Sequence, residues 1–136
     1  MKYRIAIGTN DKVNVTEHFG GSRQFTIVEI DQEKDEINYV EDRPCVFATE
    51  CGEHQEELLR EKIQVISDCQ IVLINKIGGQ SEKRLNQHDI IALQYQGTIE
   101  AALSKIKKFY KNYIFNRKEL THVRDNDQQE QSGDKI

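Results

Sequence analysis

The segment Asp68-Cys-Gln-Ile-Val-Leu-Ile-Asn-Lys-Ile-Gly78 contains four consecutive large apolar residues, Ile71–Ile74. A short, unbroken apolar run of this kind is typical of a strand that is buried on both faces of a sheet. Helices must then cover the faces of that sheet, so the run predicts an α/β fold. The chain has 136 residues, which is enough for one domain with a substantial core.

The elements on both sides of this run follow from apolar periodicity and turn signals. Alternating patterns predict three strands before it and one after it, at Lys2–Thr9, Gln24–Ile30, Glu36–Glu41 and Ile90–Leu93. Helical patterns occupy His54–Ile66, Ser81–Gln87 and a segment that begins at Thr98. The second and third strands are joined by a short charged turn, so they are expected to form an antiparallel hairpin.

This order of elements predicts where a ligand would bind. Helical crossovers make neighbouring strands parallel, so the first, third, fourth and fifth strands should end at one edge of the sheet. Open α/β sheets bind ligands at that carboxyl edge. The loops expected there contain His18, Cys45, Cys51 and His54 together with the pair Gly78-Gly79. Cys69 enters its strand from the opposite edge and is expected to pack in the core.

Composition excludes several classes of protein. A formal net charge of −4 argues against nonspecific binding of nucleic acid, which needs a basic face. No apolar run approaches the ~20 residues that span a membrane, and the amino-terminal residues enter a strand pattern directly, so the cytoplasm is expected. Three cysteines are too few for a disulfide framework.

The polar stretch Asn116–Ile136 predicts a disordered tail after a domain of residues 1–115.

Three blocks of sequence resemble the dinitrogenase iron–molybdenum cofactor biosynthesis family, which includes NifX- and NafY-type carriers and the carboxyl-terminal domain of NifB. The first is Glu17-His-Phe-Gly-Gly-Ser-Arg-Gln-Phe-Thr-Ile-Val-Glu-Ile30, and the second is the segment Asp68–Gly78 quoted above. The third, Gly97-Thr-Ile-Glu-Ala-Ala-Leu103, is similar to the start of the family's final helix. The three blocks occur in the family's order.

The resemblance implies a ribonuclease H-like, three-layer α/β/α fold with a mixed five-stranded sheet of order 3-2-1-4-5 and an antiparallel second strand. It also implies a non-enzymatic carrier or chaperone of nitrogen fixation, which transiently binds an iron–sulfur precursor of the iron–molybdenum cofactor. The expected partners are cofactor-assembly proteins or a nitrogenase component. The histidine of the family's His-Phe-Gly motif corresponds to His18. Where some carriers have a soft ligand, this chain has Asn75-Lys-Ile-Gly-Gly79.

Each candidate residue has two interpretations. His18 could coordinate iron or donate to a cluster sulfide, or it could only cap its own turn. Cys45 and Cys51 could supply thiolate ligands, or they could be unrelated thiols, since their spacing is not a Cys-x-x-Cys pattern. His54 could join them or simply begin the helix. Gly78-Gly79 could present backbone N–H groups to an anionic precursor or form an ordinary turn.

Two other functions remain to be weighed. A non-catalytic interaction protein of a metal-cluster pathway would bind no cofactor itself. A nuclease is suggested by fold class alone, but two-metal chemistry needs converging carboxylates, and the strand Tyr3–Thr9 contains none. The sequence therefore favours a carrier, with the interaction protein as its alternative.

Overall fold

The computed structural model describes residues 2–45 and 55–122. They form two units, Met1–Ile99 and Glu100–Ile136. The first unit contains five strands, β1 (Lys2–Ile7), β2 (Gln24–Asp31), β3 (Glu36–Pro44), β4 (Ile71–Ile74) and β5 (Ile91–Gln94). Its helices are α1 (Gln55–Val65) and α2 (Gly79–Gln87), whereas α3 (Ile99–His122) makes up the described part of the second unit.

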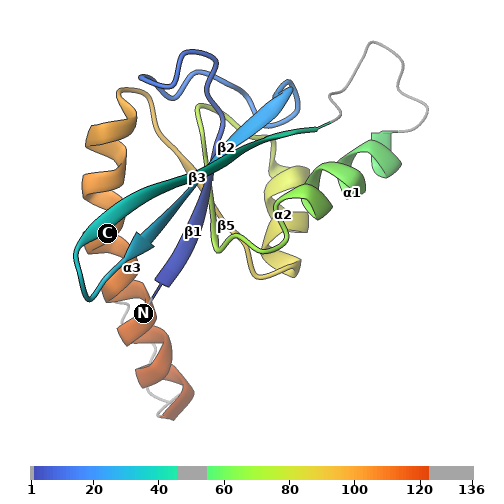
Figure 1. Cartoon of the computed structure of the whole chain (residues 1–136). Coiled ribbons are helices and arrows are strands. Elements are labelled where there is room, and N and C mark those ends of the chain that lie inside the picture. The colour runs from blue at the N-terminus through green and yellow to red at the C-terminus, as the bar shows by residue number, and fades with distance from the viewer. Residues whose placement is uncertain (1, 46–54, 123–136) are drawn as a thin grey trace. The chain divides into compact units, whose positions relative to one another are not determined.

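The five strands form one mixed sheet of order β3-β2-β1-β4-β5 (Figure 1). β2 is antiparallel to β1 and β3, whereas β4 is parallel to β1 and β5. This arrangement confirms the predicted strand order and the antiparallel second strand. The carboxyl ends of β1, β3, β4 and β5 therefore meet at one edge, and β4 lies in the interior of the sheet, as its unbroken apolar sequence predicts.

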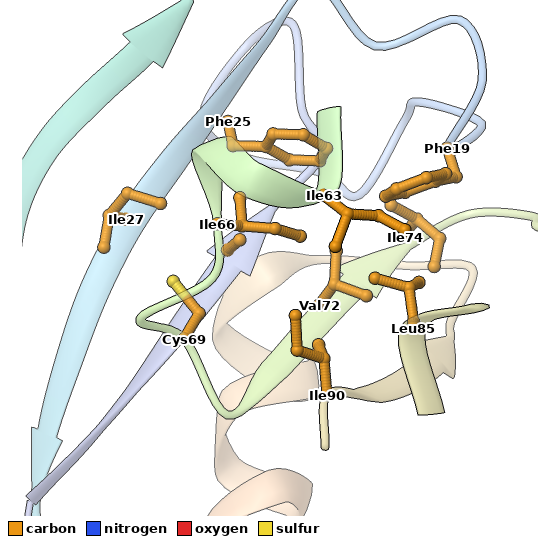
Figure 2. Close-up of a cluster of buried hydrophobic side chains, with 11 residues drawn as sticks. Phe19, Phe25, Ile27, Ile63, Ile66, Cys69, Val72, Ile74, Leu85 and Ile90 are labelled. Carbon is orange, nitrogen blue, oxygen red and sulfur yellow. The ribbon is translucent and has the colours of Figure 1, made fainter. Parts of the chain in front are cut away.

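One face of the sheet is packed against α1 and α2 by a cluster of buried apolar side chains (Figure 2). Helix α1 contributes Ile63 with Ile66 just beyond its end, and α2 contributes Leu85. Cys69 lies in the same cluster and is 2% exposed, which confirms its predicted role in the core. Burial raises the pKa of the Cys69 thiol to about 12, so this cysteine stays protonated and apolar. The residues of this cluster are Ala6, Phe19, Phe25, Ile27, Ile63, Ile66, Cys69, Val72, Ile74, Leu85 and Ile90.

The carboxyl-terminal helix extends past the predicted end of the domain. It continues to His122, although the sequence analysis places the start of a disordered tail at Asn116. The residues Arg117, Lys118, Glu119 and Leu120 all have good intrinsic helix propensity, so polar composition alone does not end a helix. The rest of the predicted tail, residues 123–136, lies outside the described residues, and the division into residues 1–115 and 116–136 stays a prediction.

A charged network connects β3, β1 and the turn before β4. Asp68 accepts two hydrogen bonds from Arg43, at 2.6 and 3.0 Å, and a third from Arg4 at 2.9 Å. Arg43 also donates to the carbonyl of Val65 at the end of α1. The hydrogen bonds from Arg43 lower the pKa of Asp68 to about 2.

This network predicts a pH-dependent contribution to stability. The folded-state pKa of Asp68 lies below its ordinary value of 3.8, so the stabilisation is present above about pH 4 and is lost as the pH falls towards 2. The side chain is 46% exposed, so we expect only about 1 kcal/mol after solvent screening. Urea unfolding of the wild type and of Asp68→Asn should differ by this amount at pH 7 and converge near pH 2. A constant difference across that range would contradict the assignment.

Candidate functional site

The turn that follows β1 lies against the turn that follows β4 at the carboxyl edge of the sheet. His18 and Lys76 form an isolated parallel bridge. The N–H of Phe19 donates to the carbonyl of Lys76, and the N–H of Asn75 donates to the carbonyl of Glu17, both at 2.9 Å. These bonds pair residues 17–19 of the loop with the chain that follows β4. They bring the His-Phe-Gly-Gly turn next to the chain that enters α2.

Gly8 is the point at which this turn folds back on β1. Its N–H donates to the carbonyl of Leu73 at 2.9 Å, and its carbonyl accepts from the N–H groups of Thr16 and Glu17 at 3.2 Å. A Cβ at this position would lie 3.0 Å from Ile74 Cγ2 and 3.2 Å from Ser22 Oγ. The absence of a side chain at Gly8 therefore allows the loop to pack closely against β1 and β4.

The backbone, rather than the imidazole, closes the turn at His18. The carbonyl of His18 accepts from the N–H of Gly21 at 3.2 Å and from the hydroxyl of Ser22 at 2.9 Å. The residue as a whole is exposed. His18 thus caps its own turn through its backbone carbonyl, and its role as a ligand stays a prediction.

Cys45 is attached to the same loop from the end of β3. Its N–H donates to the carbonyl of Arg23 at 2.9 Å, and its thiol lies 3.4 Å from the carbonyl oxygen of Ser22. Burial raises the pKa of this half-buried thiol, and the charge of Lys62 offsets part of that increase. Metal binding would need the thiolate, so capture of a metal by Cys45 would release a proton.

Lys62 lies directly beneath the loop, and the sequence analysis did not single it out. Its side chain is buried, and its Nζ donates to the carbonyls of Phe19, Gly20 and Ser22 at 3.1, 3.3 and 2.7 Å. The ammonium group also lies 5.7 Å from the centre of the Phe19 ring. The helical spacing of Lys62 could have indicated that it is buried, because this lysine shares the apolar stripe of α1 with Leu59, Ile63 and Ile66.

A pocket of about 370 Å³ opens beside this loop, between α1 and the first turn of α2. Gly78 is the N-cap of α2, and because glycine has no side chain, no side-chain hydrogen bond caps the first turn of this helix. Above this helix start, Glu56 of α1 accepts hydrogen bonds from Gln80 and Arg84 of α2. The residues that line the pocket are Phe19, Gly20, Glu56, Leu58, Leu59, Lys62, Gln80 and Ser81.

The structure brings together part of the predicted site. His18, Cys45 and the Gly78-Gly79 turn belong to three segments that meet at the carboxyl edge through Ser22 and Lys76. Cys51 and His54 lie outside the described residues. Within residues 2–45 and 55–122, no group of three or more His, Cys, Asp or Glu side chains is arranged to hold a metal ion. None of the helices described there has the length and hydropathy that crossing a membrane requires.

Comparison with known proteins adds independent evidence. The protein NifX of Rhodobacter capsulatus is 33% identical over 85 residues, which are 60% of this chain and 52% of NifX. The chain thus spans about half the length of that relative. The crystal structure of the protein PH0822 is 26% identical, covers 77% of this chain and 90% of its own, and has a TM-score of 0.55.

A more distant structure has the same fold. The apo form of the orange protein from Desulfovibrio gigas has a TM-score of 0.50 at 19% identity, covering 76% of this chain and 86% of its own. The family model described as dinitrogenase iron-molybdenum cofactor matches residues 1–108, which are most of the chain and include both turns of the site. The chain therefore belongs to the dinitrogenase iron–molybdenum cofactor family.

Proposed function

We propose that this protein is a carrier that reversibly binds an iron–sulfur precursor of the iron–molybdenum cofactor and passes it to a partner. The partner is a cofactor-assembly protein or a nitrogenase component. The observation that carries the proposal is the meeting of the His18 turn with the Lys76–Gly79 turn beside an open pocket. A carrier of this kind needs a binding edge and a means of release, and it needs no catalytic group.

The chemistry of the edge supports an iron–sulfur cargo. An exposed imidazole and a thiol are suitable ligands for iron, and the neighbouring Gly20 and Gly21 have open space where a side chain would be. In our proposal His18, Cys45 and Cys51 are the ligands, while His54, Gly78 and Gly79 lie around the cargo. A small set of protein ligands suits a cargo that has to leave again.

The proposal includes two further features. In our proposal the fold is ribonuclease H-like, and the sheet with α1 and α2 forms two of its layers. We also place the protein in the cytoplasm, where an oxygen-sensitive cargo meets a reducing environment.

The proposal predicts retention of cargo by the purified protein. The full chain is mixed without oxygen with isolated iron–molybdenum cofactor or, separately, with a synthetic thiolate-ligated [4Fe–4S] cluster, and is then desalted. We expect iron and visible absorbance to elute with the protein in at least one of the two mixtures. Colourless protein from both mixtures would overturn the proposal in favour of an interaction protein that binds no cofactor.

A further inference from the structure

Lys62 is a buried cation, and the hydrogen bonds of its ammonium group all go to the loop of residues 19–22. The residue is 3% exposed, and its three hydrogen bonds go to the backbone carbonyls of Phe19, Gly20 and Ser22. Among the residues that the structure describes, no carboxylate forms an ion pair with it. A buried ammonium group is costly unless hydrogen bonds compensate it. An apolar residue at this position would pack in the stripe of α1 without that cost, so stability of the helix packing does not explain the lysine.

The three acceptors lie in the loop that follows His18 and contacts Cys45. Phe19 follows His18 directly, and the carbonyl of Ser22 accepts from both Lys62 and the thiol of Cys45. The hydroxyl of Ser22 in turn donates to the carbonyl of His18. Lys62 is thus bonded to three carbonyls of the loop that follows His18, and one of them, that of Ser22, is shared with Cys45. It also lines the pocket beside them.

We propose that Lys62 is the positioning residue of the cargo site, which holds the loop from Phe19 to Ser22 on α1 and so sets the places of His18 and Cys45. This inference rests on the proposed carrier function. Because a trans peptide points its N–H away from its carbonyl, Lys62 also turns the N–H of Gly20 away from the ammonium group. Its positive charge beneath the loop favours an anionic cargo over a neutral or cationic one.

The first test compares Lys62→Met with Lys34→Met, which removes an exposed lysine from the β2–β3 turn at the opposite edge of the sheet. In the cargo-free full chain, we expect hydrogen exchange at the amides of Phe19 and Ser22 to become about tenfold faster or more in Lys62→Met, the size expected when charge-assisted hydrogen bonds are lost. Exchange at Val72 and Leu73 should change much less. Unchanged exchange at the loop would overturn the positioning role.

The cargo measurement separates this inference from the proposed function. We expect Lys62→Met to retain less iron after desalting than Lys34→Met, and Lys62→Arg, which keeps the charge and the donors, to retain more than Lys62→Met. Equal retention by Lys62→Met and Lys34→Met would overturn the inference while leaving the carrier function in place. If the wild type itself retains no iron, the proposed function fails, and the exchange data alone then decide whether Lys62 orders the loop.

The wild type provides a test that does not depend on a folded variant. Nitrogen-15 NMR of the lysine ammonium groups at neutral pH should show one signal with slowly exchanging protons and contacts to the ring of Phe19. Exposed lysines exchange too fast to give such a signal. If every ammonium group of the folded protein exchanges fast, the three hydrogen bonds are absent in solution and the inference is wrong.

Discussion

Replacing His18 by alanine is expected to weaken retention of the iron–sulfur cargo by about 10- to 100-fold, since removing even an outer partner of a metal ligand costs that much. The imidazole is exposed at the carboxyl edge, and the turn is closed by the backbone of His18 rather than by its ring. The substitution should therefore remove the proposed ligand and leave the loop in place. The measurement is the dissociation rate of the cargo, followed by absorbance without oxygen.

His88 provides the matched control for this prediction. It is also exposed, and it is the C-cap of α2, with its Nδ1 3.0 Å from the carbonyl oxygen of Arg84. The ring thus has a local role at the far end of the helix from the Gly78 turn. We expect His88→Ala to release cargo at the wild-type rate. If His18→Ala and His88→Ala behave alike, His18 is not a ligand.

The directions of the strands could be predicted from the sequence because their signals are local, whereas the strand order is implied by the resemblance to the family. The apolar run Ile71–Ile74 requires cover on both faces, and the short turn after Asp31 allows only an antiparallel pair. Helical crossovers then fix the direction of the remaining strands. The carboxyl edge follows from these three facts. For the same reason the meeting of His18 with the turn before Gly78 could be expected, although the bridge between His18 and Lys76 could not.

The role of Lys62 could not be predicted from the sequence in the same way. Its partners are backbone carbonyls, which every residue has, so no residue type in the sequence points to them. The three carbonyls are 40 to 43 residues away in the chain. A lysine on an apolar helical stripe is also compatible with a stem that packs while its charged group reaches water. Only the folded loop shows that the ammonium group is enclosed. The pocket is likewise formed by α1 and α2 together, and neither helix alone predicts it.

The end of the last helix is hard to predict for a related reason. The polar composition after Asn116 predicts disorder, whereas α3 continues to His122. A helix that starts well can extend through polar residues, because each added residue forms one more backbone hydrogen bond. Composition measures how much apolar surface a segment can bury, and it does not measure the local cost of continuing a helix that has already formed.

The close approach at Gly8 leads to the second large effect. Gly8→Ala is expected to lower the free energy of unfolding by about 1–3 kcal/mol, the usual cost of inserting a methyl group into a packed site. The new Cβ would lie 3.0 Å from Ile74 Cγ2, 3.2 Å from Ser22 Oγ and 3.3 Å from Glu17 Cβ. The sheet cannot move without disturbing β4, so the loop should yield first. Urea unfolding measures the stability, and hydrogen exchange at Phe19 reports the loop.

Gly21→Ala is the matched control, because a Cβ at Gly21 meets nothing within 4 Å. We expect its free energy of unfolding to stay within about 0.5 kcal/mol of the wild type. Ser22 contacts the new methyl group of Gly8→Ala and is bonded to Lys62, Cys45 and His18, so a displaced Ser22 should disturb the cargo site as well. Gly8→Ala should therefore lose cargo faster than the wild type even at temperatures where both are fully folded. A destabilised Gly8→Ala that kept its cargo as long as the wild type would show that the packing beneath the loop and the binding of cargo are independent.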